Sequence, residues 1–230
     1  MRAVVLDLFG TLVDAPAAAD RRDAAIRLAR AAHSDVDETE RYLVRSWRAR
    51  HDGTLRTTED VADDLVGSVC GRRGASRRVA ATMLGLARRR LGGVDPSVLA
   101  TARALRDQGT RLGLLSDASP EIAEAWPQSP LAPFFSVAVF SSTSGAVKPD
   151  RRLYREVTRS LGVPPDQALF CGDGGGDELA GAAAVGMRAL RVNRRGPAGA
   201  LAFGEGHWSG PSIAAVEALP DYLGLRVAGG

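Results

Sequence analysis

Three polar residues follow short apolar runs along this chain of 230 residues. Asp7 ends the first run, Ser116 follows a second and Asp173 follows a third. Apolar runs that stop at turn residues are typical of buried strands. Because the carboxyl ends of parallel strands meet at one edge of a sheet, we expect these side chains to lie close together. The sequence therefore predicts a polar site at that edge.

The same region supplies hard oxygen ligands. Asp7, Asp173 and Asp177 provide three carboxylates, the ligand type that Mg²⁺ prefers. The hydroxyls of Thr11 and Ser116, with backbone amides of the adjoining turns, can bind phosphate oxygens. We therefore expect a magnesium site with phosphate-binding groups beside it.

One cation differs in kind from all the others. Lys148 is the single lysine among 30 basic residues, and the rest are arginines. An arginine-biased composition explains most of this imbalance, but a site that needs a compact ammonium would also retain one lysine. Lys148 precedes a predicted helix that Asp150 could cap, and its charge would balance the carboxylates.

Strand-like and helix-like runs alternate after residue 92. Expected strands cover 3–7, 111–115, 136–140, 168–171 and 188–192, and expected helices cover 96–108, 119–126, 150–161, 177–185 and 211–223. Such alternation is typical of a doubly wound, Rossmann-like parallel sheet with helices on both faces. A glycine-rich loop is expected over 194–210.

Residues 15–91 are rich in Ala and Arg and contain almost no strand-like run. Apolar periodicity predicts helices over 20–33, 38–49, 59–70 and 76–91. We therefore expect an α/β core of residues 1–14 and 92–230 with an α-helical bundle inserted at 15–91. The insertion carries a net charge of +5 and the core −2. A basic insertion over an acidic core suits a small anionic substrate, although a solvated helix surface explains most of these arginines equally well.

Composition disfavours several other classes of protein. The net charge is only +3 and there is no long basic run, which argues against nucleic acid as a partner. No apolar stretch approaches bilayer length, and Asp7 interrupts the first one, so neither a membrane span nor a signal peptide is expected. Two cysteines favour a reducing cytoplasm. We expect a cytoplasmic monomer or homodimer.

Four motifs in this order, spread over nearly the whole chain, resemble the haloacid dehalogenase-like hydrolase superfamily. They are Asp7-Leu8-Phe9-Gly10-Thr11-Leu12-Val13-Asp14, Ser116 at a strand end, Lys148-Pro149-Asp150, and Gly172-Asp173-Gly174-Gly175-Gly176-Asp177. The resemblance implies that the inserted helices form a bundle-type cap and that Lys148 is the catalytic lysine.

The resemblance also implies a mechanism. Asp7 would attack the substrate and form a covalent intermediate that water then hydrolyses. Mg²⁺ would be held by Asp7, the backbone carbonyl of Phe9 and Asp173, with Asp177 orienting metal-bound water. The implied catalytic set is Asp7, Thr11, Ser116 and Lys148, and the implied substrate-binding set is Gly10, Ser116, Asp117 and Lys148.

Phe9 departs from the pattern of the phosphatases in this superfamily. They usually carry a second aspartate at this position, which protonates the leaving group and then activates water, and such acid–base help is typically worth about 10²–10⁴ in rate. Three interpretations remain open. The chain is a phosphatase of a small phosphorylated metabolite that needs little protonation or borrows an acid such as Asp117. Alternatively it is a metal-independent 2-haloacid dehalogenase, in which an aromatic residue is usual here, or it is a catalytically decayed binding or regulatory protein.

The carboxylates favour the first interpretation. Asp173 and Asp177 facing Asp7 without a cation would repel one another, which argues for a metal and hence for phosphoryl chemistry. In favour of a dehalogenase, Tyr154 lies six residues after Lys148, a pairing that those enzymes share.

Overall fold

Six parallel strands form one sheet in the computed structural model, which describes residues 1–193 and 208–225. The strand order is β3-β2-β1-β4-β5-β6. The strands are β1 (Ala3–Leu6), β2 (Arg111–Ser116), β3 (Val137–Phe140), β4 (Ala168–Gly172), β5 (Arg188–Val192) and β6 (Ser212–Ile213). This confirms the predicted Rossmann-like α/β class, with β1, which Asp7 directly follows, in the middle of the sheet.

Alternating side chains of β1 reach two separate apolar clusters. Val4 and Leu6 pack on one face of the sheet, and Ala3 and Val5 pack on the other. All four are at most 1% exposed. A strand that is buried on both faces has a continuous run of apolar residues, and this run allowed β1 to be predicted from the sequence.

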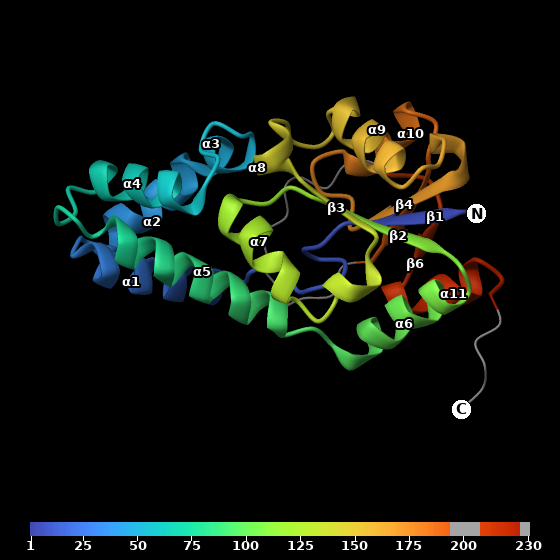
Figure 1. Ribbon diagram of the computed structural model, residues 1–230, viewed down its shortest axis with the longest axis horizontal. Coiled ribbons are helices and arrows are strands. Elements are labelled where there is room, and N and C mark those ends of the chain that lie inside the picture. The colour runs from blue at the N-terminus through green and yellow to red at the C-terminus, as the bar shows by residue number, and fades with distance from the viewer. Residues whose placement is uncertain (194–207, 226–230) are drawn as a thin grey trace.

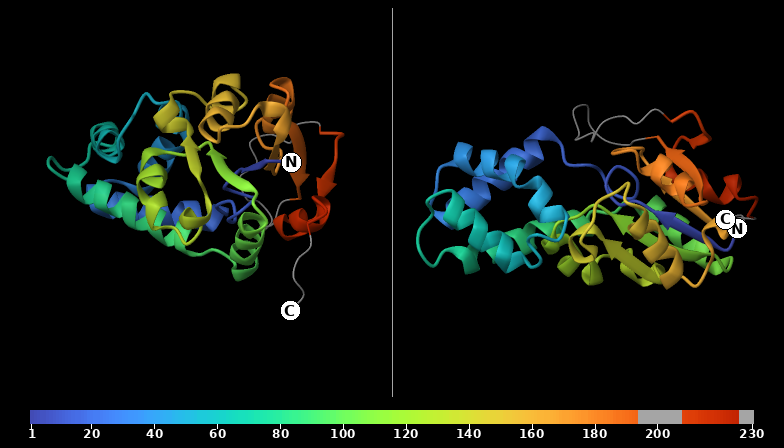
Figure 2. Two further views of the ribbon diagram at one scale, coloured as in Figure 1. Left: turned by 45° about the vertical axis from the view of Figure 1, so that its right-hand side comes forward. Right: turned by 90° about the horizontal axis from the view of Figure 1, so that it is seen from above.

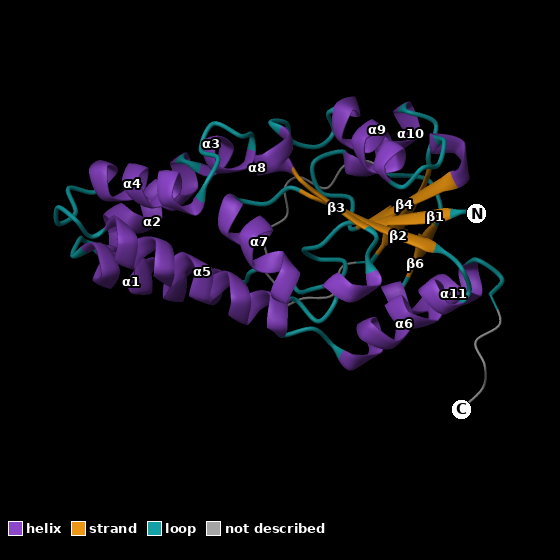
Figure 3. Ribbon diagram, in the orientation of Figure 1, coloured by secondary structure: helices purple, strands orange, loops and turns teal. Residues whose placement is uncertain are grey.

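Helices cover both faces of this sheet (Figures 1 and 3). Helices α9 and α10 lie on one side, and α6 and α11 lie on the other. Their bounds, with those of the remaining core helices, are α6 (Pro96–Asp107), α7 (Pro120–Ala125), α8 (Ser141–Ser144), α9 (Arg151–Ser160), α10 (Glu178–Ala184) and α11 (Leu219–Tyr222), and short 3-10 turns cover Trp126–Gln128, Ala132–Phe134, Pro165–Gln167 and Val216–Ala218.

The inserted segment forms a helical bundle beyond the carboxyl edge of the sheet (Figure 2). Its helices are α1 (Ala18–Ala32), α2 (Val36–Arg45), α3 (Trp47–His51), α4 (Thr58–Ser68) and α5 (Ser76–Gly92). The bundle has its own apolar cluster, which includes Leu65, Val79 and Met83. Further along α5, Ala87 and Leu91 pack into the apolar cluster of the core instead. Helix α5 is therefore shared by the two parts.

Two expectations about secondary structure were wrong in detail. The helix expected over 38–49 is divided at Ser46 into α2 and α3. At this break Arg50 donates hydrogen bonds to the Ser46 hydroxyl and to the Leu43 carbonyl. The helix expected over 211–223 begins as the short strand β6, which pairs with β5 and buries Ile213. A two-residue strand is too short to show alternation in a sequence. The loop expected over 194–210 lies mostly outside the described residues.

The inserted helical bundle, called the cap below, contacts the core at several places, and two of these contacts involve Thr58 and Gly53. The amide of Thr58 donates a 3.0 Å hydrogen bond to Glu124 Oε1 on α7. Gly53, with a φ of +82°, lies so close to the core that a Cβ there would come within 2.8 Å of the Gly145 Cα. In the described part of the chain, no helix has both the length and the apolar composition needed to cross a membrane.

A buried histidine makes the cap sensitive to acid. Burial, reinforced by the Arg50 charge, lowers the pKa of His51 to about 3. Its ring stacks on Trp47 at 4.5 Å, and its Nδ1 lies 2.7 Å from the Trp47 carbonyl oxygen, which only accepts hydrogen bonds, so the neutral ring donates. The unfolded chain binds a proton near pH 6.5 and the folded chain does not, so stability is present above that pH and is lost as the pH falls below it.

We expect the stability difference between the wild type and His51→Asn to change by about 2 kcal/mol between pH 7 and pH 5, with the wild type losing more. Denaturant unfolding at both pH values measures this difference, which cancels contributions from other titrating groups. His33→Asn is the matched control, because His33 is exposed and has a left-handed backbone that Asn tolerates. Parallel pH curves for the wild type and His51→Asn would contradict the assignment.

Candidate active site

Asp7 lies at the end of the central strand, where the carboxyl edge of the sheet faces the cap. Its amide donates a 2.9 Å hydrogen bond to the Cys171 carbonyl and so continues the pairing of β1 with β4. The residue is 5% exposed. The chain then turns sharply, because Gly10 has a φ of +82° and donates its amide to the Val13 carbonyl at 2.7 Å. This turn, residues 8–13, is called the flap below.

The loop after β4 brings a second carboxylate and a third to Asp7. Asp173 follows Gly172 directly, and its Oδ1 accepts from the Gly175 amide at 2.9 Å. The backbone then passes through Gly176 and Asp177, both with positive φ. As a result Asp177 is exposed, while Glu178, the first residue of α10, turns into the site and is 1% exposed.

Glycine is required where Glu178 enters. A Cβ on Gly172 would lie 2.0 Å from Glu178 Oε1, so a side chain there would displace the carboxylate. That same Oε1 accepts a 3.0 Å hydrogen bond from the Gly174 amide. The glycine-rich loop therefore serves to let Glu178 approach the strand ends.

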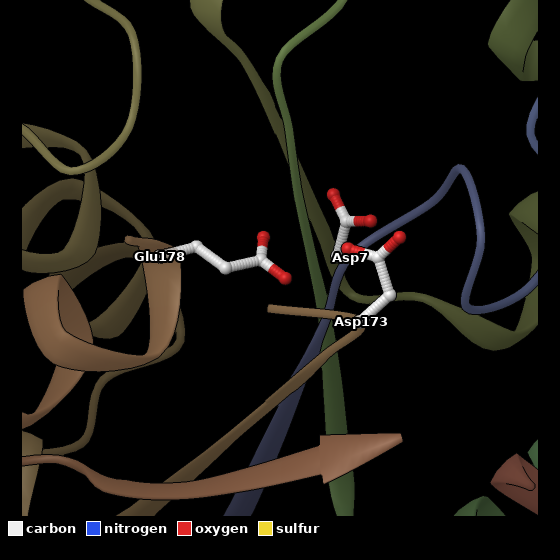
Figure 4. A group of neighbouring side chains, drawn as sticks. All are labelled: Asp7, Asp173 and Glu178. Carbon is white, nitrogen blue, oxygen red and sulfur yellow. The ribbon is translucent and has the colours of Figure 1, made fainter. Parts of the chain in front are cut away.

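Lys148 connects two of these carboxylates. Its Nζ lies 2.6 Å from Asp7 Oδ1 and 2.5 Å from Glu178 Oε2. Oxygen atoms of Asp7, Asp173 and Glu178 all lie within 4.8 Å of one another (Figure 4). Two buried carboxylates thus share one buried ammonium, and the buried carboxylate of Asp173 lies beside them.

This arrangement shifts the pKa of each partner. Burial raises the pKa of Asp7 to about 8, and the charges of Glu178 and Asp173 add to the shift while Lys148 opposes it. Burial likewise raises the pKa of Glu178. Burial alone would lower the pKa of Lys148, but the charges of Asp7 and Glu178 hold it well above its usual value. The site has more negative charge than Lys148 can neutralise.

Neighbouring groups fix the position of Lys148 and Glu178. The Lys148 amide donates to Asp117 Oδ1 at 3.0 Å. The Tyr154 hydroxyl donates to the Glu178 carbonyl at 2.9 Å, and its ring packs edge-on against Phe170. Tyr154, whose spacing from Lys148 resembles a dehalogenase pairing, thus contacts the start of α10.

Three buried hydroxyls near the strand ends have no hydrogen-bond partner within the described residues. They belong to Thr11 on the flap, Ser116 at the end of β2 and Ser142 in α8, after β3. Leaving a buried hydroxyl unsatisfied costs about 1–3 kcal/mol, so such groups are expected to meet a ligand. Thr11 and Ser116 were expected as phosphate-binding residues from sequence, and Ser142 was not.

The donor set is chemically suited to Mg²⁺. Asp7, Asp173 and Glu178 are hard oxygen donors within mutual reach of one small cation, which commonly keeps several waters besides its carboxylates. Burial is the main cause of the raised pKa of Asp7, and a divalent cation would also offset the charges of Glu178 and Asp173 that add to it. The expected ligand Asp177 is exposed and lies outside this group. Positive φ values at Gly176 and Asp177 turn the backbone so that the next residue, Glu178, points toward Asp7 instead. No feature of the sequence distinguished the two adjacent acids.

Two further residues border the group. Asp117 follows Ser116, and burial raises its pKa although the charges of Lys148 and Arg48 oppose the shift. Phe9 is half-buried on the flap, two residues beyond Asp7, and the guanidinium carbon of Arg90 lies 5.9 Å from the centroid of its ring.

Sequence comparison finds phosphatases among the relatives of this chain. Phosphoserine phosphatase of Thermus thermophilus is 34% identical over 100 residues, which cover 43% of this chain and 40% of the relative. Glyceraldehyde 3-phosphate phosphatase of Methanopyrus kandleri is 31% identical over 102 residues, which cover 43% of each. The chain thus spans less than half the length of these two curated relatives.

Solved structures share the fold over almost the whole chain. A HAD phosphatase from Thermococcus onnurineus has a TM-score of 0.67 and 22% identity, with 99% of this chain and 100% of that chain covered. A 2-haloacid dehalogenase from Pseudomonas syringae pv. Tomato has a TM-score of 0.70 and 24% identity, with 97% and 98% covered. The family model of haloacid dehalogenase-like hydrolases matches residues 1–185. This chain therefore belongs to the haloacid dehalogenase-like hydrolase family.

Proposed function

We propose that this protein is a Mg²⁺-dependent phosphatase of a small phosphorylated metabolite. The observation that carries the proposal is the buried group of Asp7, Asp173 and Glu178 around Lys148, with unpaired hydroxyls beside it. An anionic ester with several oxygen atoms would satisfy those hydroxyls. The phosphatase relatives named above support the same class of substrate.

Asp7 is the nucleophile of the proposed reaction. Its carboxylate oxygen attacks phosphorus, the bond from phosphorus to the ester oxygen breaks, and the leaving alkoxide must gain a proton. Water then attacks the phospho-aspartyl group, releases inorganic phosphate and regenerates Asp7. Lys148, already 2.6 Å from Asp7, neutralises phosphoryl oxygens, while Ser116 and Thr11 donate hydrogen bonds to them.

The proposed metal ligands are Asp7, Asp173, Glu178 and the backbone carbonyl of Phe9. When bound, Mg²⁺ would supply positive charge that offsets the charge of the phosphoryl oxygens. Asp177 is not a metal ligand in this scheme, since it is exposed just before α10.

Asp117 is the proposed proton donor in place of the aspartate that Phe9 replaces. Burial raises its pKa, which favours the protonated form that an acid needs. One of its oxygens is held by the Lys148 amide, so the carboxyl group has a fixed position beside Ser116. Phe9 itself can neither donate a proton nor activate water.

A 2-haloacid dehalogenase is the second candidate, favoured by Phe9 and by the structural likeness to the Pseudomonas enzyme. The acidic group argues against it. A halide leaves without a proton and needs no cation, so dehalogenation gives no reason to bring Asp173 and Glu178 within 4.8 Å of Asp7. The third candidate, a binding protein without catalytic activity, would have no need of the buried ion pair between Asp7 and Lys148.

We expect the purified protein to hydrolyse 4-nitrophenyl phosphate only with Mg²⁺, because the nitrophenolate leaving group needs no proton donor. Nitrophenolate absorbance with and without a chelator measures this. Asp7→Asn should reduce turnover at least about 10³-fold, since an amide is a poor nucleophile. Unchanged rates in chelator, or chloride release from 2-chloropropionate without metal, would contradict the proposal.

The choice of Glu178 over Asp177 as a metal ligand gives a paired test. Glu178→Gln should weaken Mg²⁺ activation about 10-fold or more, because it removes one of three charged ligands and one partner of Lys148. Asp177→Asn should leave the Mg²⁺ dependence near that of the wild type. Titrating activity against Mg²⁺, with Mn²⁺ binding followed by electron paramagnetic resonance, compares the two. The reverse order of effects would place the ligand at Asp177.

The proton donor is tested on leaving groups of different acidity. Asp117→Asn should slow an alkyl phosphate such as glycerol phosphate about 10²-fold and 4-nitrophenyl phosphate much less. Adding Phe9→Asp to that variant should restore part of the loss. Equal losses on both substrates would show that Asp117 only positions Lys148.

A further inference from the structure

Arg90, near the end of α5, differs from the other buried arginine of the cap. Arg50 is satisfied, because its guanidinium donates to the Leu43 carbonyl at 2.7 Å and to the Ser46 hydroxyl at 3.1 Å. Arg90 is half-buried, and burial lowers its pKa. Within the described residues it forms no ion pair and no hydrogen bond.

The carboxylate whose charge stabilises the Arg90 guanidinium is that of Asp20, which forms no ion pair with it. Asp20 attracts the guanidinium from a distance, but its Oδ2 accepts a 2.9 Å hydrogen bond from the Ala17 amide at the start of α1. Arg48, the other cap arginine that acts on the site, is exposed and paired with Asp52 at 3.2 Å. A partly desolvated guanidinium without a counter-ion is costly, which points to a charged ligand that comes from outside.

The position of Arg90 relates it to the substrate. Its guanidinium lies 5.9 Å from the centre of the Phe9 ring, in cation–π contact. Phe9 belongs to the flap and follows Asp7 by two residues, so the contact brings a fixed positive charge to the flap that borders the nucleophile. When a guanidinium packs on an aromatic ring, the N–H groups along its edge can still donate two hydrogen bonds to a carboxylate.

We propose that Arg90 is a specificity-determining residue that binds a carboxylate on the leaving-group side of the substrate. This inference rests on the proposed phosphatase function and narrows its substrate to phosphomonoesters whose organic part carries a carboxylate. Phe9 then has a positive role: it holds the Arg90 guanidinium beside the flap, at the position where the phosphatases of the superfamily usually carry an aspartate.

The test compares two alkyl phosphates that differ in this carboxylate, phosphoglycolate and ethyl phosphate. The wild type should prefer phosphoglycolate in kcat/KM, and Arg90→Gln should raise KM for phosphoglycolate about 10- to 100-fold with little change for ethyl phosphate. Arg90→Lys should retain part of the preference, because it keeps the charge without the fork. Arg88→Gln, an exposed arginine on the same helix, is the matched control and should behave as wild type.

Stability separates this role from a structural one. If Arg90 serves the ligand, Arg90→Met should melt at the same temperature as the wild type or higher; a lower melting temperature together with equal losses on both substrates would overturn the proposal. If the wild type hydrolyses no phosphate ester with Mg²⁺, the proposed function fails. Carboxylate binding by Arg90 is then tested by the change in melting temperature that phosphoglycolate causes. Stabilisation of the wild type but not of Arg90→Gln would support it, and equal shifts would refute it.

Discussion

The ionic contact of Lys148 with Asp7 and Glu178 is the constraint on which the site depends. Its members come from the ends of different elements, and all three are at most 9% exposed. Removing one partner of a buried ion pair typically costs about 3–5 kcal/mol, so the contact holds the loop before α9 and the start of α10 against β1. The same contact leaves excess negative charge, which is what makes the site receptive to a cation and then to a phosphate.

Much of the fold and part of this site could be predicted from sequence. The neighbouring strands β1 and β4 are short runs of residues buried throughout, so their positions could be predicted. Asp7, Lys148 and Asp173 do meet at one edge of the sheet. The family followed from the order of those motifs. The single lysine proved to be buried among the carboxylates.

What could not be predicted depends on backbone conformation or on contacts between distant segments. Asp177 and Glu178 are adjacent acids, and only the positive φ at Gly176 and Asp177 decides which one points inward. Ser142 lies in a short helix with no periodic pattern. Arg90 is one of many arginines in the insertion, and its contact with Phe9, which is distant in sequence, appears only in the structure.

Helix α5 gives the cap an unusual mechanical coupling to the core. Val79 and Met83 are embedded in the bundle, whereas Ala87 and Leu91 are embedded beside the sheet. A continuous helix of 17 residues is about 25 Å long and stiff, so it acts as a lever whose short arm is anchored in the core. A small tilt at Leu91 would become a larger displacement at the far end of α5. Because Arg90 lies in the part of the helix that is packed against the core, it would move less than the rest of the helix.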